Sequence, residues 1–209
     1  MRSQQLLHAA RRAELTCGDI ILYHGQHPMH LLHERRTGCF WGQVGLLLEL
    51  PRLQRLCVLE ATRISLCSDI SLGRVVHGVQ IVDLIDRMQV FGGEVAFRRL
   101  SPPLTRAERL GLLEFADEHH GRPFNGEKWV GPNALRRRNS SPSQESFFCS
   151  ELVASAYRRI GLLERPPIGY YANNFVPADF NSDYPRSILK LCGDRTMAAE
   201  FRLVISEMQ

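Results

Sequence analysis

The chain lacks any apolar run long enough to cross a bilayer, although 44% of its 209 residues are hydrophobic. A transmembrane helix needs about 20 consecutive apolar residues. The first residues, MRSQQLLHAARR, also lack the hydrophobic core of a secretory signal peptide. We therefore expect a cytoplasmic protein whose apolar residues build one core, which a chain of this length can do.

The sequence also lacks the cysteine spacing that is typical of zinc sites. The cysteines do not occur in the close pairs that zinc sites use, and a chain of this length needs no disulfides to hold its core together. We expect free thiols, no bound metal and no cofactor. The six cysteines are Cys17, Cys39, Cys57, Cys67, Cys149 and Cys192.

Lysine is scarce, because Lys128 and Lys190 are the only lysines among 26 basic residues, and the net charge is +4. No predicted strand interleaves aromatic and basic residues, and zinc-finger spacing does not occur, so we expect no nucleic-acid partner. One basic run, Arg136-Arg137-Arg138, is local. It is consistent with a solvated loop, or with peripheral contact with an anionic lipid or a nucleotide phosphate.

The spacing of apolar residues predicts an α+β fold in a single domain spanning residues 1–209. Thr105 and Glu108 have the spacing of a capping box, which predicts a helix that runs to about His120. The polar stretch 133–145 predicts a loop insertion. Strands are expected at 20–23, 44–50, 56–61, 80–83 and 94–100, helices at 4–14, 105–120 and from 149 onward, and a helical turn at 84–88.

Cys149 occupies the most informative position, at the start of the helix CSELVASAY. The positive end of a helix dipole favours a thiolate, and the thiolate is the form that attacks carbonyl carbon. Cys149 also shares a helix face with Val153, Ala156 and Ile160, which is consistent with a small buried apolar residue. Residues elsewhere in the chain favour the first interpretation.

Six short motifs follow one another along the chain: CGDIILY at 17–23, WGQVGLLLE at 41–49, VLEA at 58–61, GRPFN at 121–125, CSELV at 149–153 and FVPADF at 175–180. In this order they resemble the circularly permuted branch of the NlpC-type, papain-like cysteine hydrolases, the YiiX-like proteins, which are related to the lecithin retinol acyltransferase group. The resemblance covers about residues 16–190.

The resemblance implies a permuted papain-like fold, in which an antiparallel sheet or partial barrel packs against the helix that carries the nucleophile. Cys149 matches the nucleophile and Glu60 the third, polar position. Gln43 stands where the family has its catalytic histidine. Trp41, Ser150 and His24 are further candidates for contact with a substrate.

Gln43 makes the catalytic interpretation incomplete, because an amide cannot take up and return a proton as an imidazole does. His24, His27, His30 and His33 recur every third residue in a segment that we expect to be a loop, since Pro28 interrupts any simple helical face. These histidines are consistent with solvated or capping side chains, with a replacement base or substrate contact, or with a metal site.

Two functions therefore remain open. The first is a thiol hydrolase or acyltransferase that acts on an amide or ester of a small-molecule, peptide or lipid acyl substrate, with Cys149 as nucleophile and a helix-start amide holding the oxyanion. The second is a non-catalytic binding protein that retains the cleft between Gln43 and Cys149. The sequence leaves the oligomeric state open.

Overall fold

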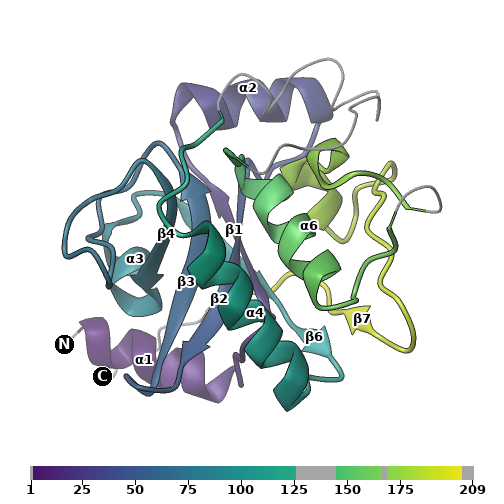
Figure 1. The fold of residues 1–209 in the computed structure, drawn as a ribbon. Helices are drawn as coiled ribbons and strands as arrows, with labels where there is room; N and C mark the ends of the chain where they lie inside the picture. Colours follow the sequence, from purple (N-terminus) through teal and green to yellow (C-terminus); the bar gives the residue numbers. More distant parts are fainter. Residues whose placement is uncertain (1, 126–144, 166–168, 204–209) are drawn as a thin grey trace.

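A five-stranded antiparallel sheet lies at the centre of the protein. Figure 1 shows a computed structural model of the chain, which describes residues 2–125, 145–165 and 169–203. The strand order is β4-β3-β2-β1-β5, and β4 and β5 form the two edges, so the sheet is open. The strands are β1 (Ile20–His24), β2 (Gln43–Leu50), β3 (Arg55–Thr62), β4 (Gly78–Asp83) and β5 (Glu94–Arg98).

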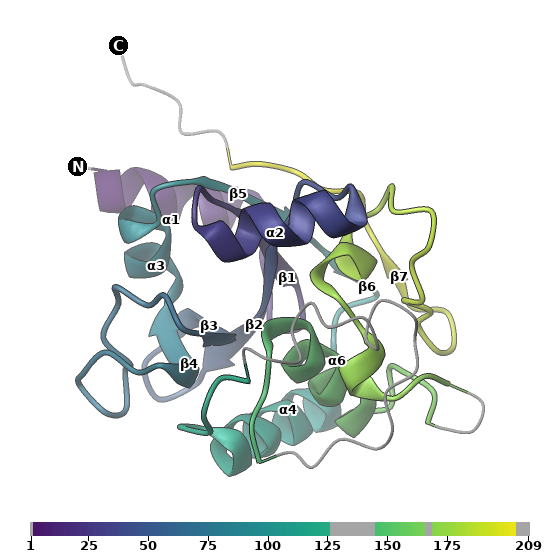
Figure 2. The same cartoon turned by 90° about the horizontal axis from the view of Figure 1, so that it is seen from above.

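Helices cover both faces of this sheet and one of its ends (Figures 1 and 2). Helices α4 (Arg106–His119) and α6 (Cys149–Arg159) cover one face, and α1 (Arg2–Arg12) and α3 (Leu84–Val90) lie on the other. Helix α2 (Pro28–Thr37) lies across the end of the sheet where β1 stops and β2 begins. The smaller elements are β6 (Leu100–Ser101), which pairs with β7 (Thr196–Met197), and the short helices η1 (Ala172–Asn174) and η2 (Pro177–Phe180).

Both faces of the central strands are apolar because both are covered. Side chains alternate across a strand, so Ile20 and Leu22 join the core beneath α4 and α6, while Ile21 and Tyr23 join the core beside α1 and α3. The same alternation continues on β2. This packing explains the nearly continuous apolar run of that strand.

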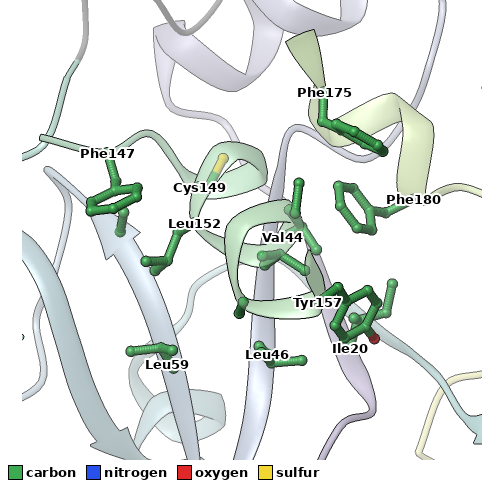
Figure 3. Packing of buried hydrophobic residues seen from close by; sticks show 14 of the residues in the cluster. Ile20, Val44, Leu46, Leu59, Phe147, Cys149, Leu152, Tyr157, Phe175 and Phe180 are labelled. Carbon is green, nitrogen blue, oxygen red and sulfur yellow. The ribbon is translucent and has the colours of Figure 1, made fainter. Parts of the chain in front are cut away.

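Helix α6 packs against β2 and β3 through a fully buried face (Figure 3). Leu152, Val153 and Tyr157 are buried there, and the Tyr157 hydroxyl donates a 2.7 Å hydrogen bond to the carbonyl of Gly18, just before β1. The capping box of α4 is confirmed, because the Thr105 hydroxyl accepts from the Glu108 amide at 3.3 Å. The Tyr157 hydrogen bond ties α6 to the segment just before β1.

The main error of the sequence interpretation concerns 28–37, which forms helix α2 instead of a loop. Pro28 is the first residue of this helix, where the missing amide hydrogen costs nothing and the fixed φ suits the helix. The expected strand 94–100 is divided at Arg99, and the turn at 84–88 continues to Val90 with Asp83 as its cap. The expected insertion lies, apart from Glu145, outside the described residues, as does Arg136-Arg137-Arg138.

In the described part of the chain, no helix combines the length and the apolar character needed to span a membrane.

Candidate active site

Cys149 is the first residue of α6, and its side chain is only 1% exposed. The preceding residue, Phe148, has an extended backbone, and its side chain does not cap the start of the helix. Figure 3 shows the Cys149 sulfur directed away from Leu46 and Leu59, which lie beneath the helix. The thiol therefore borders the apolar core without being turned into its centre, and the positive end of the α6 dipole lies next to it.

Gln43 belongs to a buried chain of hydrogen bonds that runs from α2 to α3. Its Oε1 lies 3.2 Å from Nε2 of His30, and its Nε2 donates to Oε2 of Glu60 at 3.2 Å. The second oxygen of Glu60 accepts from Gln80 Nε2 at 2.8 Å and from Arg87 Nε at 2.7 Å. All five side chains are buried, with exposures of 5% or less.

The partners of Gln43 determine which nitrogen of His30 carries a proton. A carboxylate only accepts hydrogen bonds, so the NH₂ group of Gln43 must face Glu60 and its oxygen must face His30. Nε2 of His30 therefore donates to Gln43. In a neutral imidazole the other nitrogen, Nδ1, then carries the lone pair that can accept a proton.

Burial keeps the His30 ring neutral. Desolvation lowers the pKa of His30 to about 4, although the hydrogen bond with Gln43 acts in the opposite direction. Arg87 is also desolvated, but its ion pair with Glu60 outweighs this effect and raises the pKa of Arg87. The chain of hydrogen bonds thus joins a neutral imidazole, an amide and a buried ion pair.

His30, Gln43 and Cys149 all line one cavity of about 440 Å³ at the end of the sheet. This volume suits a small molecule or a short extended segment. Glu60 does not line the cavity and lies behind Gln43, at 0% exposure. The remaining lining residues are His27, Pro28, Ala61, Arg63, Ile64 and Phe124.

Three residues expected to contact substrate do not line this cavity. His24 stacks on Phe40, with ring centroids 3.7 Å apart, and its Nδ1 lies 2.8 Å from the Phe40 carbonyl. Ser150 is fully buried and donates to the carbonyl of Phe175 at 2.9 Å. Trp41 is 5% exposed and packs edge-on against Phe40. All three make contacts that stabilise the surrounding fold, so we do not include them in the candidate site.

The histidines of the segment 24–33 have different environments. His30 and His33 are buried in α2, and burial lowers the pKa of His33 to about 3. His27 is exposed at the cavity, and its ring lies 6.3 Å from that of His30. Only His30 and His27 therefore share the cavity with Cys149.

Several other thiols are buried without lining this cavity. Desolvation raises the pKa of Cys39 to about 11, that of Cys57 to about 12 and that of Cys67 to about 11. Burial also raises the pKa of Cys17. These four thiols are therefore poor nucleophiles at neutral pH, since the thiolate is the reactive form.

Sequence reasoning missed two members of the hydrogen-bonded chain and left a third among several candidates. Gln80 lies directly opposite Glu60 in the β3–β4 pairing, so a polar residue at the matching position of the next strand was an available signal. Arg87 lies on α3 and reaches Glu60 only through the tertiary fold, which no spacing reveals. His30 was one of four equivalent histidines until α2 was placed.

No protein-family model matches the sequence, and no curated protein matches it either. A solved structure does match, the metalloprotein YiiX from Escherichia coli O157:H7, described as DUF1105. It is 17% identical, and the alignment covers 90% of this chain and 98% of that chain with a TM-score of 0.55. At this identity the likeness concerns the fold alone. The chain therefore has the fold of YiiX.

Proposed function

We propose that the protein is a thiol hydrolase or acyltransferase in which Cys149 is the nucleophile, His30 carries the proton and Gln43 orients His30. The observation that supports this proposal most is the Gln43–His30 hydrogen bond beside Cys149 in one cavity. A nucleophile, a base and a third residue that orients the base form the usual arrangement for covalent catalysis, and an amide serves as the third residue in papain-like enzymes.

In the first step the Cys149 sulfur attacks the carbonyl carbon of an ester or amide. The thiol proton passes to His30, a sulfur–carbon bond forms, and the amide groups at the start of α6 stabilise the oxyanion. His30 then protonates the departing oxygen or nitrogen as its bond to the carbonyl carbon breaks. Water or another acceptor attacks the thioester, the sulfur–carbon bond breaks and the thiol is restored.

Gln43 fits the orienting role better than the role of proton carrier. Its oxygen holds Nε2–H of His30, while its amide nitrogen is tied to Glu60, which Arg87 and Gln80 also hold. Glutamine at position 43 therefore does not remove the proton carrier from the site. We propose that helix α2 supplies the proton carrier, through His30, in place of a histidine on strand β2.

The order of the elements supports the finer proposal of a permuted NlpC-type, papain-like fold. The strands that carry Gln43 and Glu60 precede the nucleophile helix in the chain, as the resemblance of the motifs implies.

YiiX is described as a metalloprotein. Within residues 2–125, 145–165 and 169–203, however, no three histidine, cysteine, aspartate or glutamate side chains lie close enough to hold an ion together. The described residues around Cys149 therefore do not fit a metal centre, and no step of the proposed reaction passes through one.

The test is the formation of an acyl-enzyme on Cys149 from a 4-nitrophenyl ester, followed by mass spectrometry and by release of nitrophenol. We expect wild type to acylate at Cys149 and turn over, and Cys149→Ala to lose both reactions. His30→Asn should reduce acylation by about 100-fold or more, because general base catalysis contributes about that factor. His27→Asn is the matched control, since this exposed histidine lines the same cavity.

The outcomes separate the hypotheses. If His30→Asn acylates as fast as wild type, the base is not His30. If His27→Asn is the damaged variant, the exposed imidazole is the base. A folded wild type that forms no acyl-enzyme would favour the second function, a protein that binds its ligand between Gln43 and Cys149 without turnover.

A further inference from the structure

Arg63 introduces an unbalanced positive charge at the cavity of Cys149. It follows the last residue of β3, Thr62, its side chain is exposed, and it lines the cavity. Within the described residues it forms no ion pair and donates no hydrogen bond. Arg55, by contrast, is an exposed arginine that is paired, with Asp83 at 3.4 Å. The guanidinium of Arg63 is therefore available to a ligand.

No carboxylate faces Arg63 from the described lining of the cavity, which contains neither aspartate nor glutamate. The nearest acid in the hydrogen-bonded chain, Glu60, is fully buried behind Gln43 and is balanced by Arg87. The second ionisable group that is exposed at the cavity is His27, which adds no negative charge. An anion near Cys149 would thus be attracted by Arg63 and repelled by none of these residues.

Apolar residues also line the cavity beside Arg63. Ala61 and Ile64 lie on either side of it in the chain, and Phe124 comes from the segment before α6. A cavity with apolar walls and a few placed polar groups binds a compact organic molecule whose polar end is fixed. Guanidinium binds carboxylate and phosphate oxygens through parallel hydrogen bonds.

We propose that Arg63 determines specificity by binding an anionic group, a carboxylate or a phosphate, on the acyl compound that reacts with Cys149. Ala61, Ile64 and Phe124 contact the apolar part of that compound. That the bound compound is an acyl compound rests on the proposed function. The anion site itself requires only that Arg63 and Cys149 face one cavity.

The test compares alkylation of Cys149 by iodoacetate and by iodoacetamide, two reagents of similar size that differ in charge. The ratio of their rate constants at one pH reports the potential at the sulfur, because the thiolate fraction cancels. Arg63→Gln should lower this ratio about fivefold, which corresponds to one charge acting across a partly solvated cavity. Arg63→Lys should retain most of it, and added salt should reduce the difference.

Arg52→Gln is the matched control, because Arg52 is an exposed arginine in the turn at the far end of the β2–β3 hairpin. It should leave the ratio unchanged. A ratio that is equal in wild type and Arg63→Gln would overturn the inference. The ratio needs no turnover, so a protein that fails to form an acyl-enzyme can still show the anion site.

Protection of Cys149 against iodoacetamide identifies the anion. Acetate should protect wild type if the group is a carboxylate, and inorganic phosphate should protect if it is a phosphate. In either case Arg63→Gln should abolish the protection. The inference fails if neither anion slows alkylation, or if both slow it equally in wild type and Arg63→Gln.

Discussion

At the scale of single residues, the buried Arg87–Glu60 ion pair supports the candidate site through the hydrogen bond between Glu60 and Gln43. Glu60 accepts hydrogen bonds from Gln43, Gln80 and Arg87, and the guanidinium of Arg87 lies 4.7 Å from the centre of the Tyr23 ring. Removing one partner of a buried pair leaves a charge without compensation, which costs more than removing both. The site therefore depends on a residue that does not line the cavity.

We predict that Arg87→Met lowers the free energy of unfolding by about 3 kcal/mol or more. The double variant Arg87→Met/Glu60→Gln should lose clearly less than the sum of the two single losses. Urea unfolding at neutral pH measures all four proteins. Arg55→Met is the control, because its exposed pair with Asp83 at 3.4 Å should contribute less than about 1 kcal/mol. Additive losses would show that Arg87 and Glu60 do not depend on each other.

The sequence identified some residues of the site and missed others for a physical reason. Cys149, Gln43 and Glu60 stand in short motifs whose order along the chain is readable, and the structure brings Cys149 and Gln43 to one cavity with Glu60 behind. Arg87 has no such signal, because an arginine on a short helix looks solvated until its partner is placed. Trp41 stands in one of the same motifs, and its contacts lie outside the cavity.

At the scale of elements, helix α2 supplies the proposed proton carrier and was the least predictable part of the fold. Hydrophobic periodicity identifies a helix by its apolar face. The side chains that α2 buries include His30 and His33, which such a pattern counts as polar. Pro28 was taken as an interruption, although it opens the helix. By contrast, α6 buries an ordinary apolar face and was predicted at its correct start.

The buried histidines of α2 predict a loss of stability in acid. Burial lowers the pKa of His33 from 6.5 to about 3. The unfolded chain therefore binds a proton below pH 6.5 that the folded protein does not bind, and stability falls as the pH falls. His33→Gln should remove about 2 kcal/mol of the loss between pH 7 and 4.5.

Urea unfolding of wild type and variant at the two pH values measures this difference. His77→Gln, which replaces an exposed histidine, is the control and should keep the pH dependence of wild type. An unchanged pH dependence in His33→Gln would mean that the His33 ring is accessible to protons in the folded protein.

At the scale of the whole molecule, the sheet brings together residues that are far apart in the chain. The end of the sheet where β2 begins and β3 stops carries Gln43 and, through the next residues, Arg63. Helix α2 crosses this end, and α6 begins beside it (Figure 1). The apolar patterns predicted most of the strands and helices, and the resemblance of the motifs implied the antiparallel sheet and the packing of α6 against it. The sequence could not predict that α2 would bring an imidazole to the same cavity.

The central claim is that His30 takes the proton of Cys149, and the pH dependence of Cys149 acylation by a 4-nitrophenyl ester tests it most directly. Because burial lowers the pKa of His30 to about 4, its ring is neutral at any pH above that value. The rate constant for acylation of wild type should therefore be almost independent of pH between about 5 and 7, because a neutral base is present throughout. In His30→Asn it should be smaller and rise about tenfold per pH unit, following the thiolate. Identical pH dependence in the two proteins would contradict the account.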